Sequence, residues 1–245
     1  MRNDAKRSRG WLTLLFLITP AVVILEKSAT AQVKTEESAT IPVPREGAWM
    51  KNHQSFLDRA SEGNIDLLFL GDSITQGWND NDVWKRHYAP RHAANFGIGG
   101  DRTQHVLWRL ENGEIDGIKP KVTVLMIGTN NVRANTVDEI AAGITAIVKT
   151  LQSKLPETKI LLLGVFPRSK DPDATRERLA AINKKIARLD DGKTVKFLDF
   201  GVKFLEDDGT ISREIMPDYL HLTRKGYCIW ADAMEPTLWE MLEGK

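Results

Sequence analysis

Short apolar runs alternate along the chain with segments whose apolar residues recur at helical spacing. Several of the runs are continuously apolar and bounded by Gly or Pro, which is typical of strands buried on both faces of a parallel sheet. The pattern predicts five strands, over residues 66–70, 93–96, 122–127, 160–166 and 195–198.

The segments between these runs carry helix signals. Thr136 and Glu139 form a capping-box pattern that opens a helix, and Pro156 closes it. An amphipathic stripe predicts a second helix over residues 173–189, and Thr223 can cap a last helix that ends near residue 242. Alternating strands and helices predict a single-domain, three-layer, doubly wound α/β fold with a flavodoxin-like parallel sheet. In such a fold, ligands bind beyond the carboxyl ends of the strands.

The N-terminus has the three parts of a secretory signal peptide. Residues 2–9 hold four basic side chains, residues 11–25 are apolar, and the small residues Ala29 and Ala31 provide a cleavage pattern. We expect a signal peptide over residues 1–31, and therefore a protein that is exported to the periplasm or secreted. An uncleaved membrane anchor is the alternative. A proline and a glutamate shorten the apolar run, so we expect no stable anchor after cleavage.

Composition limits what the rest of the chain does. Residues 32–45 are polar with two prolines and predict a flexible leader, so the folded domain is expected over residues 46–245. The formal charge of the whole chain is +1, and cleavage after Ala31 removes a net charge of +3, which leaves −2. A slightly acidic chain without a basic run has no electrostatic attraction for nucleic acid. The single cysteine, Cys228, excludes an intrachain disulfide, so stability must come from a packed core.

Candidate chemistry lies where the predicted strands end. Ser73 follows the first strand and would project its hydroxyl at the carboxyl end of that strand, with its backbone N–H at a helix N-terminus. Helix capping by Asp72 and Ser73 is the alternative interpretation. A glycine-rich turn, residues 97–100, follows the second strand, and its N–H groups can approach an anion. It lacks the last glycine of a dinucleotide-binding fingerprint, and a plain tight turn is the alternative.

Two further junctions carry polar side chains. Asn130 follows the third strand and can donate an amide hydrogen bond above the sheet, although Asn is also a common turn residue. Asp218 and His221 can hydrogen-bond to each other in a turn before the last helix, which would fix the imidazole tautomer. The other four histidines show no metal-ligand spacing. Together the junctions provide a nucleophile, oxyanion donors and a base with its orienting carboxylate, which acyl transfer requires without a metal or cofactor.

Four sequence blocks occur in the order of a known family. GDSITQG (71–77), NFGIGGD (95–101), GTNN (128–131) and DYLHL (218–222) resemble the Ser, Gly, Asn and His blocks of the SGNH (GDSL) hydrolases. More narrowly, residues 95–122 together with the GTNN and PDYLHLT segments resemble the catalytic (alpha) subunits of intracellular platelet-activating factor acetylhydrolase. The resemblance covers residues 46–240 and implies the SGNH hydrolase fold.

The resemblance also implies roles for individual residues. Ser73 would be the nucleophile, and Asp218 and His221 would complete a catalytic triad. The oxyanion hole would consist of the backbone N–H groups of Ser73 and Gly100 and the side-chain amide of Asn130. The family points to acetyl esters as substrates and, because its catalytic subunits pair with one another, to a homodimer by analogy. Those relatives are cytosolic, whereas this chain carries an export signal.

The substrate stays open at this point. One interpretation is an acetylated phospholipid, as in the relatives; a second is an O-acetylated extracytoplasmic glycan, which an exported enzyme would meet; longer acyl esters are a third. From a different class, a non-catalytic ligand-binding module on the same fold is the alternative to an esterase, and the intact set of functional positions argues against it. Ile74, Thr129 and Leu220 adjoin the catalytic positions and are candidates for lining the substrate pocket, with ordinary packing as the alternative.

Overall fold

The structure, a computed structural model of the chain, describes Met1, residues 38–79 and residues 81–243. Apart from Met1, the expected signal peptide over residues 1–31 lies outside the described residues, as do residues 32–37 of the expected leader. Within the described part of the chain, no helix is long and apolar enough to cross a membrane.

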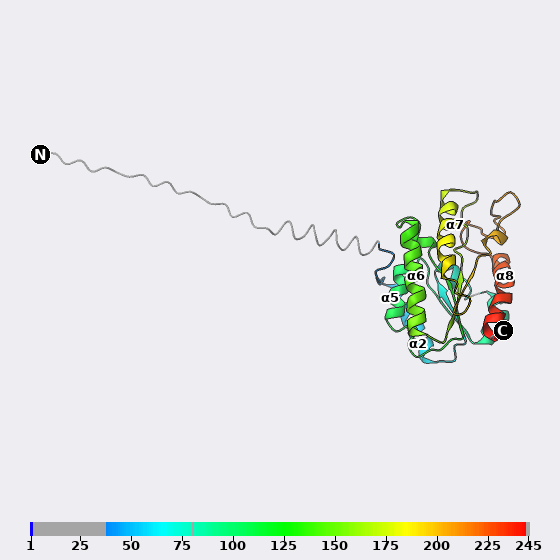
Figure 1. The fold of residues 1–245 in the computed structure, drawn as a ribbon, viewed down its shortest axis with the longest axis horizontal. Coiled ribbons are helices and arrows are strands. Elements are labelled where there is room, and N and C mark those ends of the chain that lie inside the picture. The colour runs from blue at the N-terminus through cyan, green and yellow to red at the C-terminus, as the bar shows by residue number, and fades with distance from the viewer. Residues whose placement is uncertain (2–37, 80, 244–245) are drawn as a thin grey trace. The chain divides into compact units, whose positions relative to one another are not determined.

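A five-stranded parallel sheet forms the centre of the domain (Figure 1). The strands lie in the order β2-β1-β3-β4-β5, which is the flavodoxin-like order with its switch point between β1 and β3. The predicted doubly wound α/β fold is therefore confirmed. The strands are β1 (Leu67–Gly71), β2 (Ala93–Gly97), β3 (Val122–Met126), β4 (Lys159–Leu163) and β5 (Val195–Leu198).

All five predicted strands are present, and the largest difference in their bounds is at the end of β4. The prediction extended this strand to residue 166, whereas it ends at Leu163. The backbone N–H of Val165 donates to the side chain of Asn183 at 2.8 Å instead of to a neighbouring strand. The apolar run continues past the strand because Val165 and Phe166 are buried.

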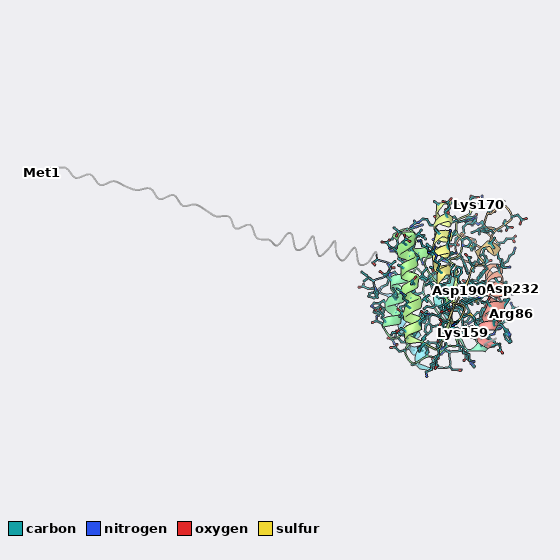
Figure 2. All side chains as sticks on the ribbon, viewed as in Figure 1. Met1, Arg86, Lys159, Lys170, Asp190 and Asp232 are labelled. Carbon is teal, nitrogen blue, oxygen red and sulfur yellow. The ribbon has the colours of Figure 1, made fainter. Side chains whose placement is uncertain are left out.

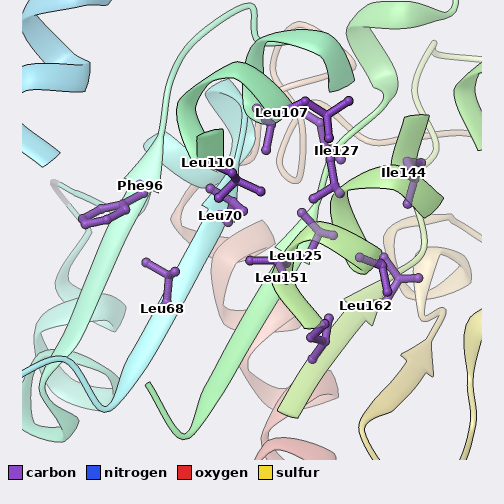
Figure 3. Packing of buried hydrophobic residues seen from close by; sticks show 14 of the residues in the cluster. Leu68, Leu70, Phe96, Leu107, Leu110, Leu125, Ile127, Ile144, Leu151 and Leu162 are labelled. Carbon is purple, nitrogen blue, oxygen red and sulfur yellow. The ribbon is translucent and has the colours of Figure 1, made fainter. Parts of the chain in front are cut away.

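Helices cover both faces of the sheet (Figure 1). One layer packs against Leu68, Leu70 and Leu125, and the opposite layer packs against Leu67 and Phe69, because successive strand residues point to opposite faces. Figure 3 shows the first of these two cores. The first layer consists of α2 (Ala48–Ser61), α5 (Thr103–Glu111), α6 (Val137–Lys154) and α7 (Ala174–Ile186); the second contains α4 (Asp82–His87) and α8 (Arg224–Glu243).

The two helices predicted from the capping residues Thr136 and Thr223 begin with the expected capping hydrogen bonds. The Thr136 hydroxyl accepts from the Glu139 N–H at 3.2 Å while the Glu139 carboxylate accepts from the Thr136 N–H at 2.7 Å, so the capping box is complete. At the start of α8, the Thr223 hydroxyl accepts from the Gly226 N–H at 3.3 Å. Charged side chains such as those of Lys170 and Asp232 lie at the outside of the domain (Figure 2).

The described part of the expected leader, residues 38–45, is held against the domain. Ala39 is buried, and its carbonyl accepts from the Thr103 hydroxyl at 2.7 Å. Further along, the Arg45 guanidinium donates to the Gly99 carbonyl at 2.8 Å and lies 3.1 Å from the Asp101 carboxylate. These contacts bring the segment to the glycine-rich turn that follows β2.

Candidate active site

Ser73 lies just beyond the carboxyl end of the interior strand β1, as the first residue of the short helix α3 (Ser73–Gln76). Asp72 caps this helix through a 3.0 Å hydrogen bond from the Ile74 N–H to its carboxylate. The turn is closely packed, since a Cβ added to Gly97 on the neighbouring strand would overlap the backbone of α3 at Gln76. The local sequence therefore fixes Ser73 at the edge of the sheet where parallel α/β folds bind ligands.

The structure brings Ser73, His221 and Asp218 into line, although the serine and histidine are 148 positions apart. The Ser73 Oγ lies 2.9 Å from the His221 Nε2, and the His221 Nδ1 lies 2.6 Å from an Asp218 oxygen. An ionised carboxylate only accepts hydrogen bonds, so the proton of the neutral ring sits on Nδ1 and Nε2 is free to accept from the serine hydroxyl.

Hydrogen bonds keep Asp218 ionised. Partial burial raises the pKa of its carboxyl, but the His221 ring and the backbone N–H groups of His221 and Leu220 more than offset this, so the pKa lies below its ordinary value. The two N–H groups donate to the second carboxylate oxygen at 2.8 and 3.1 Å. Tyr219 turns the chain between the two triad positions with a φ of 61°, in the left-handed region that non-glycine residues seldom occupy.

The triad is open to water. The side chains of His221 and Asp218 are 45% and 53% exposed. Water can therefore reach the imidazole directly.

The glycine-rich turn and Asn130 meet beside Ser73. Gly100 adopts a φ of 76°, which suits a residue without a side chain. The Gly99 N–H donates to the side chain of Gln76 at 2.9 Å, which ties the turn to α3. Asn130 lies in a 3₁₀ turn directly after β3, and its side-chain amide donates to the Asp101 carbonyl at 2.9 Å. The structure thus places the amide next to the turn that carries Gly100.

A buried charge cluster holds this turn from behind. The Asp101 carboxylate, fully buried, accepts from the Trp49 indole at 2.6 Å and lies 3.0 Å from the guanidinium of Arg109. Arg109 is also fully buried, and a second ion pair of 2.6 Å joins it to Glu114. Separating the partners of such a cluster would leave an uncompensated buried charge, which is energetically costly, so the structure strongly favours this arrangement.

Asp72 is the other buried carboxyl of the site. Its burial, together with the nearby charge of Asp101, raises its pKa to about 7, while the Ile74 N–H, His221 and Arg168 act in the opposite direction. A long contact of 3.5 Å joins its second oxygen to the Asn130 amide. The capping interpretation of Asp72 is therefore correct, and it applies alongside the contact between Ser73 and His221.

A hollow of about 350 Å³ opens at this site. Of the three residues that the sequence indicated as pocket candidates, Thr129 and Leu220 line it. Ile74 does not, because it is buried in the core on the α8 side of the sheet, where it packs as an ordinary apolar residue. The full lining consists of residues from the turns after the strands and from the loop that carries Asp218 and His221: Gly100, Arg102, Thr129, Asn130, Arg133, Arg168 and Leu220.

Sequence reasoning missed the three arginines of this hollow. Arg102, Arg133 and Arg168 follow β2, β3 and β4, so their positions just beyond the strand ends were the signal available in the sequence.

A larger hollow of about 610 Å³ lies at the opposite end of the sheet, between residues 115–121 and 154–158, away from Ser73 and His221. Among the described residues, no group of three or more His, Cys, Asp or Glu side chains is arranged to hold a metal ion.

A doubly wound sheet with a serine, an imidazole and a carboxylate aligned at its carboxyl edge is the architecture of an α/β hydrolytic enzyme. Comparison with known families agrees with this class. The model of the GDSL-like lipase/acylhydrolase family matches residues 69–229, and the chain belongs to this family. It is accordingly an ester hydrolase.

Two catalogued mammalian proteins are similar to the chain over most of their length. The chain is 39% identical to the human platelet-activating factor acetylhydrolase IB subunit alpha1 over 213 residues, which covers 84% of this chain and 92% of that protein. It is 41% identical to the rat alpha2 subunit over 196 residues, or 80% of this chain and 85% of that protein. The narrower resemblance found in the sequence is thereby confirmed.

Solved structures share the fold at lower sequence identity. A GDSL-like lipase from Bacteroides thetaiotaomicron superposes with a TM-score of 0.63 at 17% identity, covering 77% of this chain and 98% of that one. An acetylxylan esterase from Geobacillus stearothermophilus superposes with a TM-score of 0.57 at 21% identity, covering 71% and 93%. At these identities the likenesses show the fold alone.

Proposed function

We propose that the chain hydrolyses short-chain esters, chiefly acetyl esters, by a Ser–His–Asp acyl-enzyme mechanism with Ser73 as nucleophile. The observation that carries the proposal is the continuous hydrogen-bonded line from the Ser73 hydroxyl through the His221 ring to the Asp218 carboxylate, with distances of 2.9 and 2.6 Å. A weak nucleophile such as a serine hydroxyl needs an adjacent, oriented base of this kind.

In the first step, His221 Nε2 takes the Ser73 proton as Oγ attacks the ester carbonyl, and Asp218 stabilises the imidazolium that forms. The imidazolium then gives its proton to the leaving alcohol, which leaves an acyl-serine. Water attacks that acyl group with His221 again as base, and the acid and free Ser73 are released. This mechanism uses no metal or organic cofactor, so EDTA should leave turnover unchanged.

The oxyanion would be held by three donors: the backbone N–H groups of Ser73 and Gly100 and the side-chain amide of Asn130. The Asn130 amide has two N–H bonds. One donates to the Asp101 carbonyl at 2.9 Å and orients the group, and the other has the long 3.5 Å contact with Asp72 that a substrate oxyanion can replace. The buried cluster of Asp101 and Arg109 keeps this geometry fixed before the substrate arrives.

An acetylated phospholipid is the first candidate substrate, because the relatives at about 40% identity bear the name of an acetylhydrolase of platelet-activating factor. An O-acetylated glycan is the second candidate, and the expected export of the chain favours it. We also propose that residues 1–31 are removed on export; mass spectrometry of protein recovered outside the cytoplasm of a secretion-competent host should find Gln32 as its first residue. The homodimer implied by the family remains a prediction.

The test is acetate release by the purified protein from an acetylated phospholipid and an acetylated polysaccharide, measured side by side. Ser73→Ala should remove nearly all release, since members of a triad act as a unit. Ser55→Ala is a matched control, because Ser55 is an exposed serine on α2 that bonds to the Asn52 carbonyl. Release that survives in Ser73→Ala would eliminate Ser73 as nucleophile, and no release from these substrates or from a simple acetyl ester would eliminate the short-acyl activity.

A further inference from the structure

Three arginines surround the entrance to the proposed reaction centre. Arg102, Arg133 and Arg168 come from the loops after three different strands, and all three line the same 350 Å³ hollow. Gly100 and Asn130, the proposed oxyanion donors, line it as well. The positive charges therefore surround the hollow that the proposed oxyanion donors line.

These three arginines lack the ion pairs that other arginines of the domain make. Arg109 is paired with two buried carboxylates, and Arg45 is paired with Asp101. By contrast, within residues 38–79 and 81–243 no carboxylate oxygen lies within 4.0 Å of the guanidinium groups of Arg102, Arg133 or Arg168. Their charge is thus available to a ligand.

Bringing these cations together has an energetic cost. Partial burial, and next the positive charge of Arg133, hold the pKa of Arg168 below its ordinary value. The negative charges of Asp173, Asp218 and Asp72 oppose this only in part. The Arg168 guanidinium has one polar contact in the hollow, 3.4 Å from the Thr129 hydroxyl. An anion bound between the arginines would relieve their repulsion and pair with groups that are already partly desolvated.

We propose that this hollow binds an anionic group on the alcohol part of the ester, a carboxylate or a phosphate, and that the enzyme therefore prefers anionic acetyl esters to neutral ones. The inference rests on the proposed function and specifies its substrate class. A planar guanidinium presents paired N–H donors that match the oxygens of either anion. The acetyl group is uncharged, so the anion must belong to the leaving alcohol.

Four phenyl acetates that differ in the para substituent test the preference. They are 4-acetoxybenzoate and 4-acetoxyphenyl phosphate as anions, 4-acetoxybenzamide as the neutral ester, and 4-acetoxy-N,N,N-trimethylanilinium as the cation. We expect kcat/KM to be at least about tenfold higher for an anion than for the benzamide, since hydrogen bonds to charged groups are the stronger class. The advantage should shrink as salt is added. Whichever anion is preferred identifies the group as carboxylate or phosphate, and equal kcat/KM for all four esters would overturn the proposal.

Variants assign the preference to the arginines. In Arg102→Gln and Arg133→Gln, the ratio of kcat/KM for the preferred anion to that for the benzamide should fall several-fold, and in the double variant it should approach one. Arg133→Lys should restore part of the ratio because it keeps the charge. The matched control is Arg188→Gln, which removes an exposed arginine after α7 that does not line the hollow, and its ratio should equal that of the unmodified protein. An unchanged ratio in the double variant would show that the hollow does not select the anion.

A binding measurement separates this inference from the proposed function. Titration calorimetry of the Ser73→Ala protein with 4-acetoxybenzoate, 4-acetoxyphenyl phosphate and 4-acetoxybenzamide reports on the hollow without turnover. Preferential binding of an anion that is lost in the added Arg102→Gln and Arg133→Gln changes supports the anion site even if no ester is hydrolysed. If the neutral ester is hydrolysed with dependence on Ser73 but no anion is preferred in binding or turnover, the proposed function stands and the anion site does not.

Discussion

Asp218 holds His221 at two points: one carboxylate oxygen lies 2.6 Å from the ring Nδ1, and the other accepts the backbone N–H of the same histidine at 2.8 Å. The first contact fixes the tautomer and the rotation of the ring, and the second fixes where its backbone lies. The three-residue spacing of these side chains is thus part of the geometry of the site, since it allows a single carboxylate to make both contacts.

Asp218→Asn should lower kcat strongly while the fold persists. Asparagine keeps an oxygen for the backbone N–H groups but loses the charge that stabilises the imidazolium, and its NH₂ group can favour the wrong tautomer. We expect a loss of kcat of about 100- to 10,000-fold, toward the lower end because the pair is half-exposed to solvent. Steady-state kinetics on an acetyl ester measures this. A loss of less than about tenfold would remove Asp218 from the triad, and Asp208→Asn, at an exposed turn, serves as the control.

Asn130→Asp tests the side-chain donor of the proposed oxyanion hole. The substitution keeps the size of the side chain but replaces the NH₂ group with an oxygen that repels an oxyanion. We expect kcat to fall at least about 100- to 1,000-fold, the usual loss for one oxyanion donor, with a much smaller effect on KM. The melting temperature should be recorded in parallel, because the amide also donates to the Asp101 carbonyl. Unimpaired kcat in a folded variant would exclude Asn130 from the oxyanion hole.

Gly97→Ala and Gly99→Ala form a matched pair in the block around the glycine-rich turn. At Gly97, a Cβ would overlap the backbone of α3, whereas at Gly99 it would meet the flexible end of the Gln76 side chain at 3.1 Å. We expect Gly97→Ala to displace α3 and Ser73, costing about 1–3 kcal/mol of unfolding free energy together with most of the activity. Gly99→Ala should have the smaller effect on both. Urea unfolding and esterase assays check the order, and equal losses would show that the packing against α3 does not position Ser73.

Much of the fold was predictable because local patterns carried the information. Strands β1 and β3 are buried on both faces, so their apolar runs are nearly continuous. The caps at Thr136 and Thr223 depend on residues close by in the sequence. The proximity of Ser73 and His221 was predictable for a related reason: in a parallel sheet, residues that follow different strands gather at one edge. The sequence blocks around Ser73 and His221 therefore indicated a shared site although they are far apart.

Features that depend on long-range packing were not predictable in this way. Ile74 directly follows Ser73, yet it points into the core on the α8 side, because α3 turns its side chain away from the hollow. The arginines of the hollow, such as Arg133, resemble ordinary surface charges until the loops that carry them are placed together. Residues 38–45 read as a polar leader, but their contacts with Thr103 and the glycine-rich turn are made across more than 50 positions.

The buried carboxyl of Asp72 is a further feature of this kind, and it gives the fold a pH dependence. Its pKa is about 7 in the folded protein against 3.8 for an unperturbed aspartate, chiefly because of burial. Between these two values the folded state binds the proton and the unfolded state does not, so the free energy of unfolding falls as the pH rises through this window. Above pH 7, Asp72 is ionised in both the folded and the unfolded state, and the folded state carries the full free-energy cost of the buried charge.

Asp72→Asn should abolish this dependence, because asparagine does not titrate and its side-chain oxygen can still accept the Ile74 N–H that caps α3. Relative to the unmodified protein, the variant should gain roughly 2–4 kcal/mol of unfolding free energy between pH 4.5 and pH 7.5. Urea unfolding at several pH values measures the two curves, with Asp232→Asn, at an exposed position of α8, as the control that should stay parallel to the unmodified protein. If the Asp72→Asn curve also stays parallel, Asp72 is ionised throughout this range. The Ile74 N–H and the nearby charges of His221 and Arg168 would then outweigh the burial of the carboxylate.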